Sequence, residues 1–165
     1  MKKIITLLAV VGMFSLQGCT VDDNAVDQDT ISTVFETQEV NFIPANNFVI
    51  KFNFPNVIFS SDMVLVYRLA GAANGRDLWE FLPETYYFAD GTRDFSYNFN
   101  FTNTFVDIYL NGNDLLSVPT GNRLNQIFRI VVVPANLINA VDKNNYLAVM
   151  NAIKVNESHI QKIKF

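Results

Sequence analysis

Residues 94–101 alternate between apolar and polar side chains at every step, and this pattern constrains the fold more than any other feature of the chain. Phe95, Tyr97, Phe99 and Phe101 hold the apolar positions, with Asp, Ser and Asn between them. A period of two is typical of a β-strand with one buried face and one wet face, because successive side chains of a strand point to opposite faces. We therefore predict a strand here that covers an apolar core.

Other segments have the same character. Residues 48–54 alternate as clearly, residues 63–69 alternate with less contrast, and residues 128–133 are apolar on both faces. A run that is apolar on both faces predicts a central strand covered on both sides. Shorter candidate strands are residues 34–42, 78–82, 85–88, 105–110 and 158–165.

Turn and helix signals complete the prediction of the fold. Asn74-Gly75, Asp90-Gly91 and Asn111-Gly112 are pairs that favour the type I′ turns of β-hairpins. Residues 134–138 predict a helical turn. A second helix over residues 146–153 has its apolar side chains on one face.

We expect Asp142 or Asn144 to cap that second helix. The predicted fold class is mainly β: a single antiparallel β-sandwich or open barrel with a short helical segment near the C-terminus.

The N-terminus has the features of an export signal. Two lysines precede an apolar run of thirteen residues, 4–16, which is too short to span a bilayer but suits a secretory signal. Leu16-Gln17-Gly18-Cys19 closes this run and contains the only Cys of the chain. The tetrapeptide resembles the lipobox of bacterial lipoproteins, in the looser form with Gln that Bacteroidota use. The alternative is an ordinary signal peptide.

The lipobox resemblance implies that residues 1–18 are a lipoprotein signal peptide, removed after Cys19 is acylated. Two or three acyl chains would then hold the protein stably in a membrane. Thr20 is not the Asp that retains lipoproteins in the inner membrane, so the resemblance implies an outer-membrane location.

Residues 19–32 are predicted to be a lipidated, acidic and flexible tether. Six acidic residues and no basic residue lie between Cys19 and Lys51, whereas ten acidic and ten basic residues balance from Asn41 onward. Asp22 and Asp23 resemble the acidic export signal of surface-exposed Bacteroidota lipoproteins, although they lie one position later than usual. The alternative is a plain solvated linker.

A second short motif lies in the same segment. Asp29-Thr30-Ile31 is similar to the Asp-(Ser/Thr)-aliphatic motif that Bacteroidota use for O-glycosylation. The resemblance makes Thr30 a candidate glycosylation site.

Composition excludes several classes of function. The chain has 165 residues, 50% of them hydrophobic, and a net charge of −4, which fits one folded domain and argues against a nucleic-acid partner. One His and one Cys leave no evident metal site, cofactor site or catalytic triad, and we expect His159 on the surface. Asp142-Lys143-Asn144 lacks the Gly and Glu of a calcium loop. We therefore predict no enzyme, although a carboxylate pair on distant segments would escape detection.

Twenty Asn residues are the unusual feature of the composition. Asn closes turns, and its amide also suits sugar hydroxyls beside an exposed aromatic ring. Trp79, Tyr86, Tyr87 and Tyr109 are candidate ligand-facing aromatic residues. The alternative is that these rings belong to the core.

The leader, the aromatic β-rich middle, residues 128–134 and residues 146–164 together resemble small, uncharacterised outer-membrane or cell-surface lipoproteins of flavobacteria and other Bacteroidota. The resemblance implies a location and no established activity. Residues 33–165 would form the single β-sandwich domain.

The function we expect is that of a lipid-anchored, non-catalytic interaction or accessory module. Its partners would be the membrane, through Cys19, and an outer-membrane protein or a glycan. The alternatives are a carbohydrate-binding lipoprotein of a glycan-uptake system and a hydrolase. A large exposed apolar patch would favour the first function, coplanar exposed aromatic rings flanked by Asn the second, and two facing carboxylates in a pocket the third.

Overall fold

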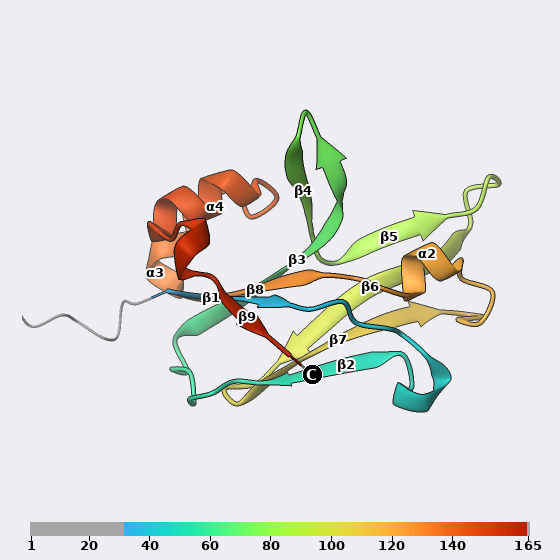
Figure 1. Cartoon of the computed structure of the whole chain (residues 1–165), viewed down its shortest axis with the longest axis horizontal. Helices are drawn as coiled ribbons and strands as arrows, with labels where there is room; N and C mark the ends of the chain where they lie inside the picture. Colours follow the sequence, from blue (N-terminus) through green and yellow to red (C-terminus); the bar gives the residue numbers. More distant parts are fainter. Residues whose placement is uncertain (1–31, 165) are drawn as a thin grey trace, which may run out of the picture.

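The computed structural model describes residues 32–164, which form two β-sheets packed face to face (Figure 1). The first sheet has the order β4-β3-β8-β1-β9 and the second the order β2-β7-β6-β5. The first sheet consists of β1 (Thr33–Thr37), β3 (Asp62–Ala73), β4 (Arg76–Phe81), β8 (Phe128–Pro134) and β9 (Gln161–Ile163). The second consists of β2 (Val49–Asn53), β5 (Glu84–Tyr87), β6 (Arg93–Phe101) and β7 (Phe105–Gly112). The mainly β fold is confirmed, as the sandwich rather than the barrel.

Short helices connect and cover the sheets. They are η2 (Pro44–Asn46), α2 (Thr120–Arg123), α3 (Ala135–Ile138), α4 (Tyr146–Ile153) and η3 (Glu157–His159). Neighbouring strands run antiparallel, except that β9 lies parallel to β1. The strand predicted over residues 158–165 is shorter in the structure: η3 occupies residues 158 and 159, and β9 begins at Gln161.

The core between the sheets contains the apolar positions of the predicted alternating strands. Ile50 and Phe52 of β2 and Phe95 and Tyr97 of β6 lie on the inner face of the second sheet, in one apolar cluster that also includes Phe35 of β1 in the first sheet. Each of these five side chains is buried. The period-two prediction is confirmed for residues 48–54 and at Phe95 and Tyr97, but it is wrong at two positions of β6: Phe101 is 40% exposed, and Ser96 of the predicted wet face is buried.

A second apolar cluster explains why the central strands lack a polar face. Helices α3 and α4 cover the outer face of the first sheet, where Leu65 and Tyr67 of β3 pack with Val131 of β8 and Val149 of α4. All seven residues of β8 are buried. The prediction that residues 128–133 form a central, covered strand is confirmed.

The three predicted turns have different outcomes. Asn74 and Gly75 both have positive φ, 54° and 74°, as a type I′ hairpin requires. At Asp90-Gly91 only the glycine has positive φ, so the type I′ prediction is wrong there. Asn111-Gly112 is not a turn, because both residues belong to β7 and pair with β6.

Gly112 has a different reason to be glycine. A Cβ atom at this position would lie 2.9 Å from the carbonyl oxygen of Asp94, so the two strand backbones approach each other too closely for a side chain. An Asn-Gly pair therefore marks a close contact between strands here, and not a reversal of the chain.

The cap of α4 also differs from the prediction. Asn145, not Asp142 or Asn144, is the N-cap, and its Oδ1 accepts a hydrogen bond from the N–H of Ala148 at 3.0 Å. Asp142 instead accepts the N–H of Asn144 in the preceding turn. Asn and Asp serve equally well in both positions, so their identity alone does not distinguish them.

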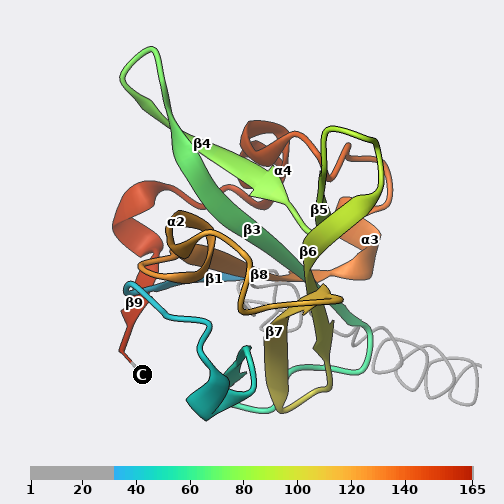
Figure 2. The ribbon, with the colours of Figure 1, turned by 90° about the vertical axis from the view of Figure 1, so that its right-hand side faces the viewer.

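The sandwich has two ends, at the left and right of Figure 1, and the right-hand end faces the viewer in Figure 2. We call one the apolar end: it consists of the β2–β3 loop (residues 54–61), the β6–β7 turn (residues 102–104) and α3, and it lies beside the start of β1. We call the other the charged end: it consists of the β5–β6 turn (residues 88–92), the loop of residues 113–119 and α2. The β3–β4 hairpin projects from the sandwich between them.

Candidate functional site at the Arg68 cluster

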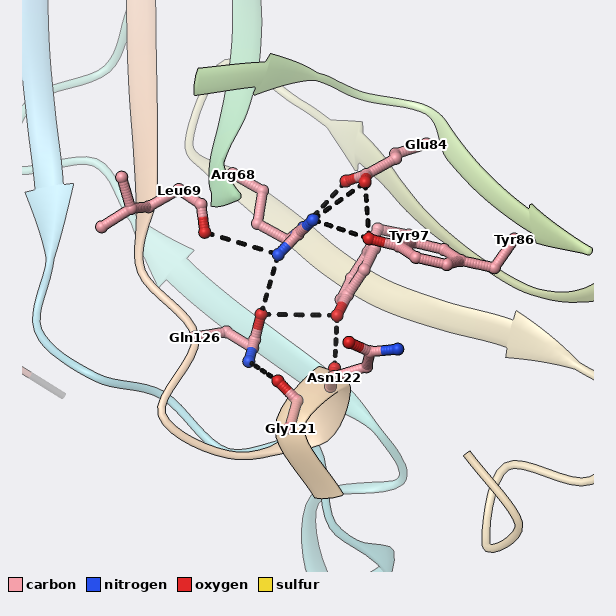
Figure 3. Close-up of polar contacts among 8 residues, drawn as sticks. All are labelled: Arg68, Leu69, Glu84, Tyr86, Tyr97, Gly121, Asn122 and Gln126. Carbon is pink, nitrogen blue, oxygen red and sulfur yellow. Dashed lines mark hydrogen bonds and ion pairs between the residues drawn. The ribbon is translucent and has the colours of Figure 1, made fainter. Parts of the chain in front are cut away.

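A buried arginine lies between the two sheets, in the half of the sandwich nearer the charged end. Arg68 of β3 is 6% exposed and pairs with Phe128, the first residue of β8. Because side chains alternate along a strand, Tyr67 points to the outer face and Arg68 points inward. Its side chain lies among Glu84, Tyr86, Tyr97 and Gln126, and we call these five residues the Arg68 cluster (Figure 3).

Every donor of Arg68 has an acceptor within the protein. Its Nε and Nη2 donate to the two carboxylate oxygens of Glu84, both at 2.8 Å. Nη2 also donates to the Tyr86 hydroxyl at 2.7 Å, and Nη1 donates to Gln126 Oε1 at 3.3 Å and to the Leu69 carbonyl at 3.4 Å. A guanidinium has five N–H groups, so none is left for a ligand. Arg68 thus joins the first sheet to β5 of the second.

The hydroxyl groups of the cluster extend this network. Tyr86 donates to Glu84 Oε1 at 2.7 Å, and its ring stacks on Phe95 with the ring centroids 4.5 Å apart. Tyr97 donates to the backbone carbonyl of Asn122 in α2 (Figure 3).

Gln126 holds the same short helix. Its Nε2 donates to the carbonyls of Gly121 at 2.8 Å and Leu124 at 2.7 Å. The cluster therefore connects three parts of the chain: β3, β5 and α2.

The electrostatics of the cluster are those of a stable ion pair. Burial disfavours the charged forms, but the hydrogen bonds between Arg68 and Glu84 outweigh it, so the pKa of Glu84 is lowered and the pKa of Arg68 is raised. Burial and the hydrogen bond to Glu84 raise the pKa of Tyr86 to about 12. At neutral pH the cluster holds one cation, one anion and neutral phenols, and none of these groups is poised as an acid or base.

A shallow cleft of about 290 Å³ opens beside the cluster. Its polar lining includes Arg68, Tyr86, Asn122, Asn125 and Gln126. No carboxylate of the described chain lines it. Amides that donate and accept hydrogen bonds suit a neutral polar ligand such as a sugar, and they supply no catalytic group.

A second buried arginine lies on the opposite face of the first sheet, beneath the helices. Arg129 of β8 is 3% exposed, and its Nε donates to Glu36 of β1 at 2.8 Å. Nη1 and Nη2 donate to the two oxygens of Glu157 in η3 at 2.8 and 2.6 Å, and Nη1 also donates to the Tyr146 hydroxyl. The guanidinium lies 4.2 Å from the ring centre of Trp79. We call these residues the Arg129 cluster; it fixes α4 and η3 to the sheet.

The structure does not bring the four predicted ligand-facing aromatic residues together. Trp79 is 7% exposed and packs against Arg129 and Tyr146, so it belongs to the core, as the alternative interpretation allowed. Tyr86 is half-buried in the Arg68 cluster. Tyr87 is 64% exposed.

Tyr109 is half-buried on β7 and lies far from Tyr87. Tyr109 pairs with Asn98 of β6, whereas Tyr87 pairs with Arg93, five residues away on the same strand. Five residues of a strand span about 17 Å, so the two rings do not form one platform.

The structure offers little support for a hydrolase. One cleft of about 500 Å³ has two carboxylates in its lining, Glu36 and Glu39. Burial opposes ionisation of Glu36, but the hydrogen bonds from Arg129 and Lys162 prevail and lower its pKa. An acid catalyst needs a raised pKa, so Glu36 does not suit that role in glycoside hydrolysis.

Other candidates from the sequence have simple outcomes. His159 is exposed, as expected, at the end of η3. Within residues 32–164, no group of three or more His, Cys, Asp or Glu side chains could hold a metal ion. Cys19, Asp22, Asp23 and Thr30 lie outside the described residues. No helix in the described part of the chain is long and apolar enough to cross a membrane.

Sequence reasoning missed both buried arginines. Each one interrupts an apolar run, as in Tyr67-Arg68-Leu69 and Phe128-Arg129-Ile130, and the second run was predicted to be covered on both faces. An arginine in a covered strand must be paired, because a buried lone charge is too costly. That signal indicates that carboxylate partners exist, but it does not identify Glu84 or Glu36.

Comparisons of the whole chain with protein-family models, with curated proteins and with solved structures find no match.

Proposed function

We propose that this chain is a lipid-anchored module of the bacterial outer membrane, displayed at the cell surface, which acts through non-catalytic contacts. The observation that carries the proposal is Leu16-Gln17-Gly18-Cys19 at the end of a thirteen-residue apolar run, with the only Cys of the chain at its last position. Acylation of that thiol provides an anchor without a membrane-spanning helix.

The chemistry of the described domain supports a binding role over a catalytic one. Arg68 and Arg129 donate all their N–H groups to acceptors within the protein. The apolar end exposes large apolar side chains, among them Val57, which is 65% exposed, and Phe59, which is 53% exposed. An exposed apolar patch on a folded domain is typical of a contact surface.

Replacement of the Cys tests the anchor. Cys19→Ala should abolish labelling by a palmitate analogue and remove the protein from the membrane fraction. Ser15→Ala, in the same leader, is the matched control and should keep both. If the Cys19→Ala protein were labelled as strongly as the wild type, the anchor would be wrong.

Display at the surface is tested separately. Asp22→Asn together with Asp23→Asn keeps the length and shape of the segment and removes two charges that an export receptor could bind. Intact cells should then protect the protein from added protease, while the total amount in the membrane stays the same. Equal digestion of the variant and the wild type would exclude an export role for these two residues.

A second candidate function is carbohydrate binding, favoured by the cleft beside the Arg68 cluster. Asn122, Asn125 and Tyr86 line it and offer amides and a ring edge to sugar hydroxyls. Asn122→Ala should weaken binding to a glycan array at least tenfold, while its backbone carbonyl, which accepts from Tyr97, remains. Asn113→Ala, on an exposed loop outside the cleft, is the control. Absence of any glycan signal for the wild type would rule out this function.

A further inference from the structure

The apolar end is one continuous surface built from three segments. Phe54 N–H donates to the carbonyl of Thr104, and Ile58 N–H donates to that of Asn103, both at 2.9 Å. These bonds join the β2–β3 loop to the β6–β7 turn. Ala135 N–H donates to the Ser61 carbonyl at 3.3 Å, which joins the same loop to α3.

This surface exposes hydrocarbon. Val57 is 65% exposed, Phe59 53%, Phe101 40% and Leu137 38%. The ring of Phe101 stacks on that of Phe99, with centroids 6.5 Å apart and planes 17° apart.

The two Asn residues that flank the stacked rings in the sequence do not lie on the same face as the rings. Side chains alternate along β6, so the amides of Asn98 and Asn100 point to the face opposite Phe99 and Phe101. These two amides therefore add no hydrogen-bonding groups to the surface of the rings.

The three segments of the apolar end also contain few charged groups. Residues 52–61, 95–106 and 130–141 contain no Asp, Glu, Lys or Arg. Asp62, the next residue after the loop, is partly exposed and lines the groove beside Val57 and Phe59; its Oδ2 accepts the Phe59 N–H at 3.0 Å, and its Oδ1 is buried. Charged groups are costly near lipid hydrocarbon, and their absence lets a surface approach it closely.

Exposed apolar residues at the charged end have a different setting. Leu116 is 64% exposed, and the consecutive Tyr87 and Phe88 are 64% and 52% exposed, but each lies within three residues of Asp114 or Asp90. Exposure of apolar residues next to charges is ordinary and needs no partner.

The position of the apolar end in the chain suits a lipid partner. Thr33, the first residue of β1, lines a groove of about 540 Å³ together with Val57 and Phe59. Twelve residues separate Cys19 from Ser32, and the thirteen Cα–Cα steps between these two residues reach at most about 45 Å when fully extended. An anchor on Cys19 therefore keeps this end of the domain within reach of the membrane and raises its effective concentration there.

We propose that the apolar end rests on the phospholipid surface in which Cys19 is anchored, with Val57, Phe59, Phe101 and Leu137 at the boundary between headgroups and acyl chains. This inference depends on the anchoring proposed above. A second copy of the chain fits less well, because four partly exposed side chains fall short of the roughly 800 Å² per partner of a standard interface. The domain would then present its charged end and the cleft beside the Arg68 cluster away from the membrane.

A matched pair of fluorescent labels tests the proposal on the full-length, lipidated protein. Val57→Cys and Leu116→Cys place a label at positions that are 65% and 64% exposed in the native protein, at opposite ends. The label reacts at one site because Cys19 is the only native Cys and is acylated. The protein is reconstituted into phosphatidylethanolamine and phosphatidylglycerol vesicles that contain nitroxide-labelled lipid. We expect quenching at position 57 to exceed that at position 116 at least threefold.

A second variant and a separate readout, flotation of the protein together with the vesicles, complete the design. Phe59→Asp should lower quenching at position 57 to the value seen at position 116. Equal, weak quenching at both positions, with the protein still floating with the vesicles, would overturn the docking and leave the anchor intact. Failure to float would overturn the anchor itself. Self-quenching that depends on protein density would assign the surface to a second copy and also overturn lipid docking.

Discussion

The two ends of the sandwich differ in where they place charge. At the apolar end, three connected segments contain no charged residue, and Val57, Phe59, Leu137 and the adjoining Phe101 of β6 are exposed. Inside the sandwich and beneath the helices, both buried arginines pair with carboxylates, at Arg68–Glu84 and at Arg129 with Glu36 and Glu157. The comparison separates two tasks: buried ion pairs hold the fold together, and the apolar end leaves hydrocarbon free for contact.

The two clusters themselves differ in how they are supported. Glu84, 20% exposed, takes its salt bridge from Arg68 alone among the described residues. Glu36 binds Lys162 at 3.1 Å as well as Arg129. Glu157, the other partner of Arg129, is 74% exposed and hydrated. Loss of Arg68 therefore leaves a more isolated carboxylate than loss of Arg129.

The largest expected effect is the loss of Arg68. Arg68→Met should lower the free energy of unfolding by about 3–5 kcal/mol, because it leaves Glu84 partly buried without its cation. Chemical denaturation measures the change. Arg76→Met, on the exposed β3–β4 hairpin, is the control and should change it by no more than about 0.5 kcal/mol. A loss below about 1 kcal/mol for Arg68→Met would contradict the role of the cluster.

A double variant sharpens this prediction. Arg68→Met combined with Glu84→Leu removes both charges, so no unpaired group remains in the seam between the sheets. We expect the double variant to be more stable than Arg68→Met alone. If the double variant lost as much unfolding free energy as Arg68→Met, or more, the lost packing of the Arg68 side chain, and not the unpaired carboxylate, would account for the destabilisation.

Arg129→Met should have the next largest effect, about 3 kcal/mol. In this variant Glu36 still has its salt bridge to Lys162, and the exposed carboxylate of Glu157 is solvated by water. The loss of unfolding free energy therefore lies near the lower end of the range for a broken buried ion pair. Loss of the contact between Arg129 and Trp79 should also let water reach the Trp79 ring, so the Trp79 fluorescence should shift toward longer wavelength. A cost greater than that of Arg68→Met would reverse the proposed ranking of the two clusters.

The pH dependence of stability tests the same half of the molecule. The pKa values of Glu36 and Glu84 in the folded protein lie below their ordinary value of 4.5, because the arginine bonds outweigh burial. The unfolded state therefore takes up protons first as the pH falls, and the free energy of unfolding should decrease below about pH 4.5. Glu84→Gln should reduce this slope. An unchanged slope would exclude Glu84 as a contributor.

The smallest expected effect belongs to the apolar end. Phe59→Ser and Val57→Ser should change the free energy of unfolding by less than about 0.5 kcal/mol, because both side chains are more than half exposed. A loss above about 2 kcal/mol would show that these residues support the fold and would break the division of tasks between the two ends.

Much of the fold follows from local pattern, because burial in a strand repeats every two residues. Phe95 and Tyr97 are buried as predicted, and the doubly apolar run of residues 128–133 is the central strand β8. Asn111-Gly112 was wrong as a turn, since its glycine serves a close strand contact with Asp94 that depends on pairing across the sheet. Local sequence does not specify such a contact.

The Arg68 cluster was beyond prediction for a related reason. Glu84 lies 16 residues from Arg68 in the chain, and Gln126 lies 58 residues away. Their meeting depends on how the two sheets stack, which alternation along one strand does not encode. Trp79 was missed for the same reason. Its aromatic ring made it a candidate for ligand binding, but the ring packs against Arg129, a residue of another strand.

Neutron reflectometry on the lipidated, full-length protein at a supported phospholipid bilayer tests the central claim most directly, because it measures where protein density begins relative to the headgroups. We predict that dense protein begins at the headgroup layer, with the apolar end in contact with it. The contradicting result is a hydrated gap between the headgroups and the folded domain, up to the roughly 45 Å that the twelve intervening residues can span.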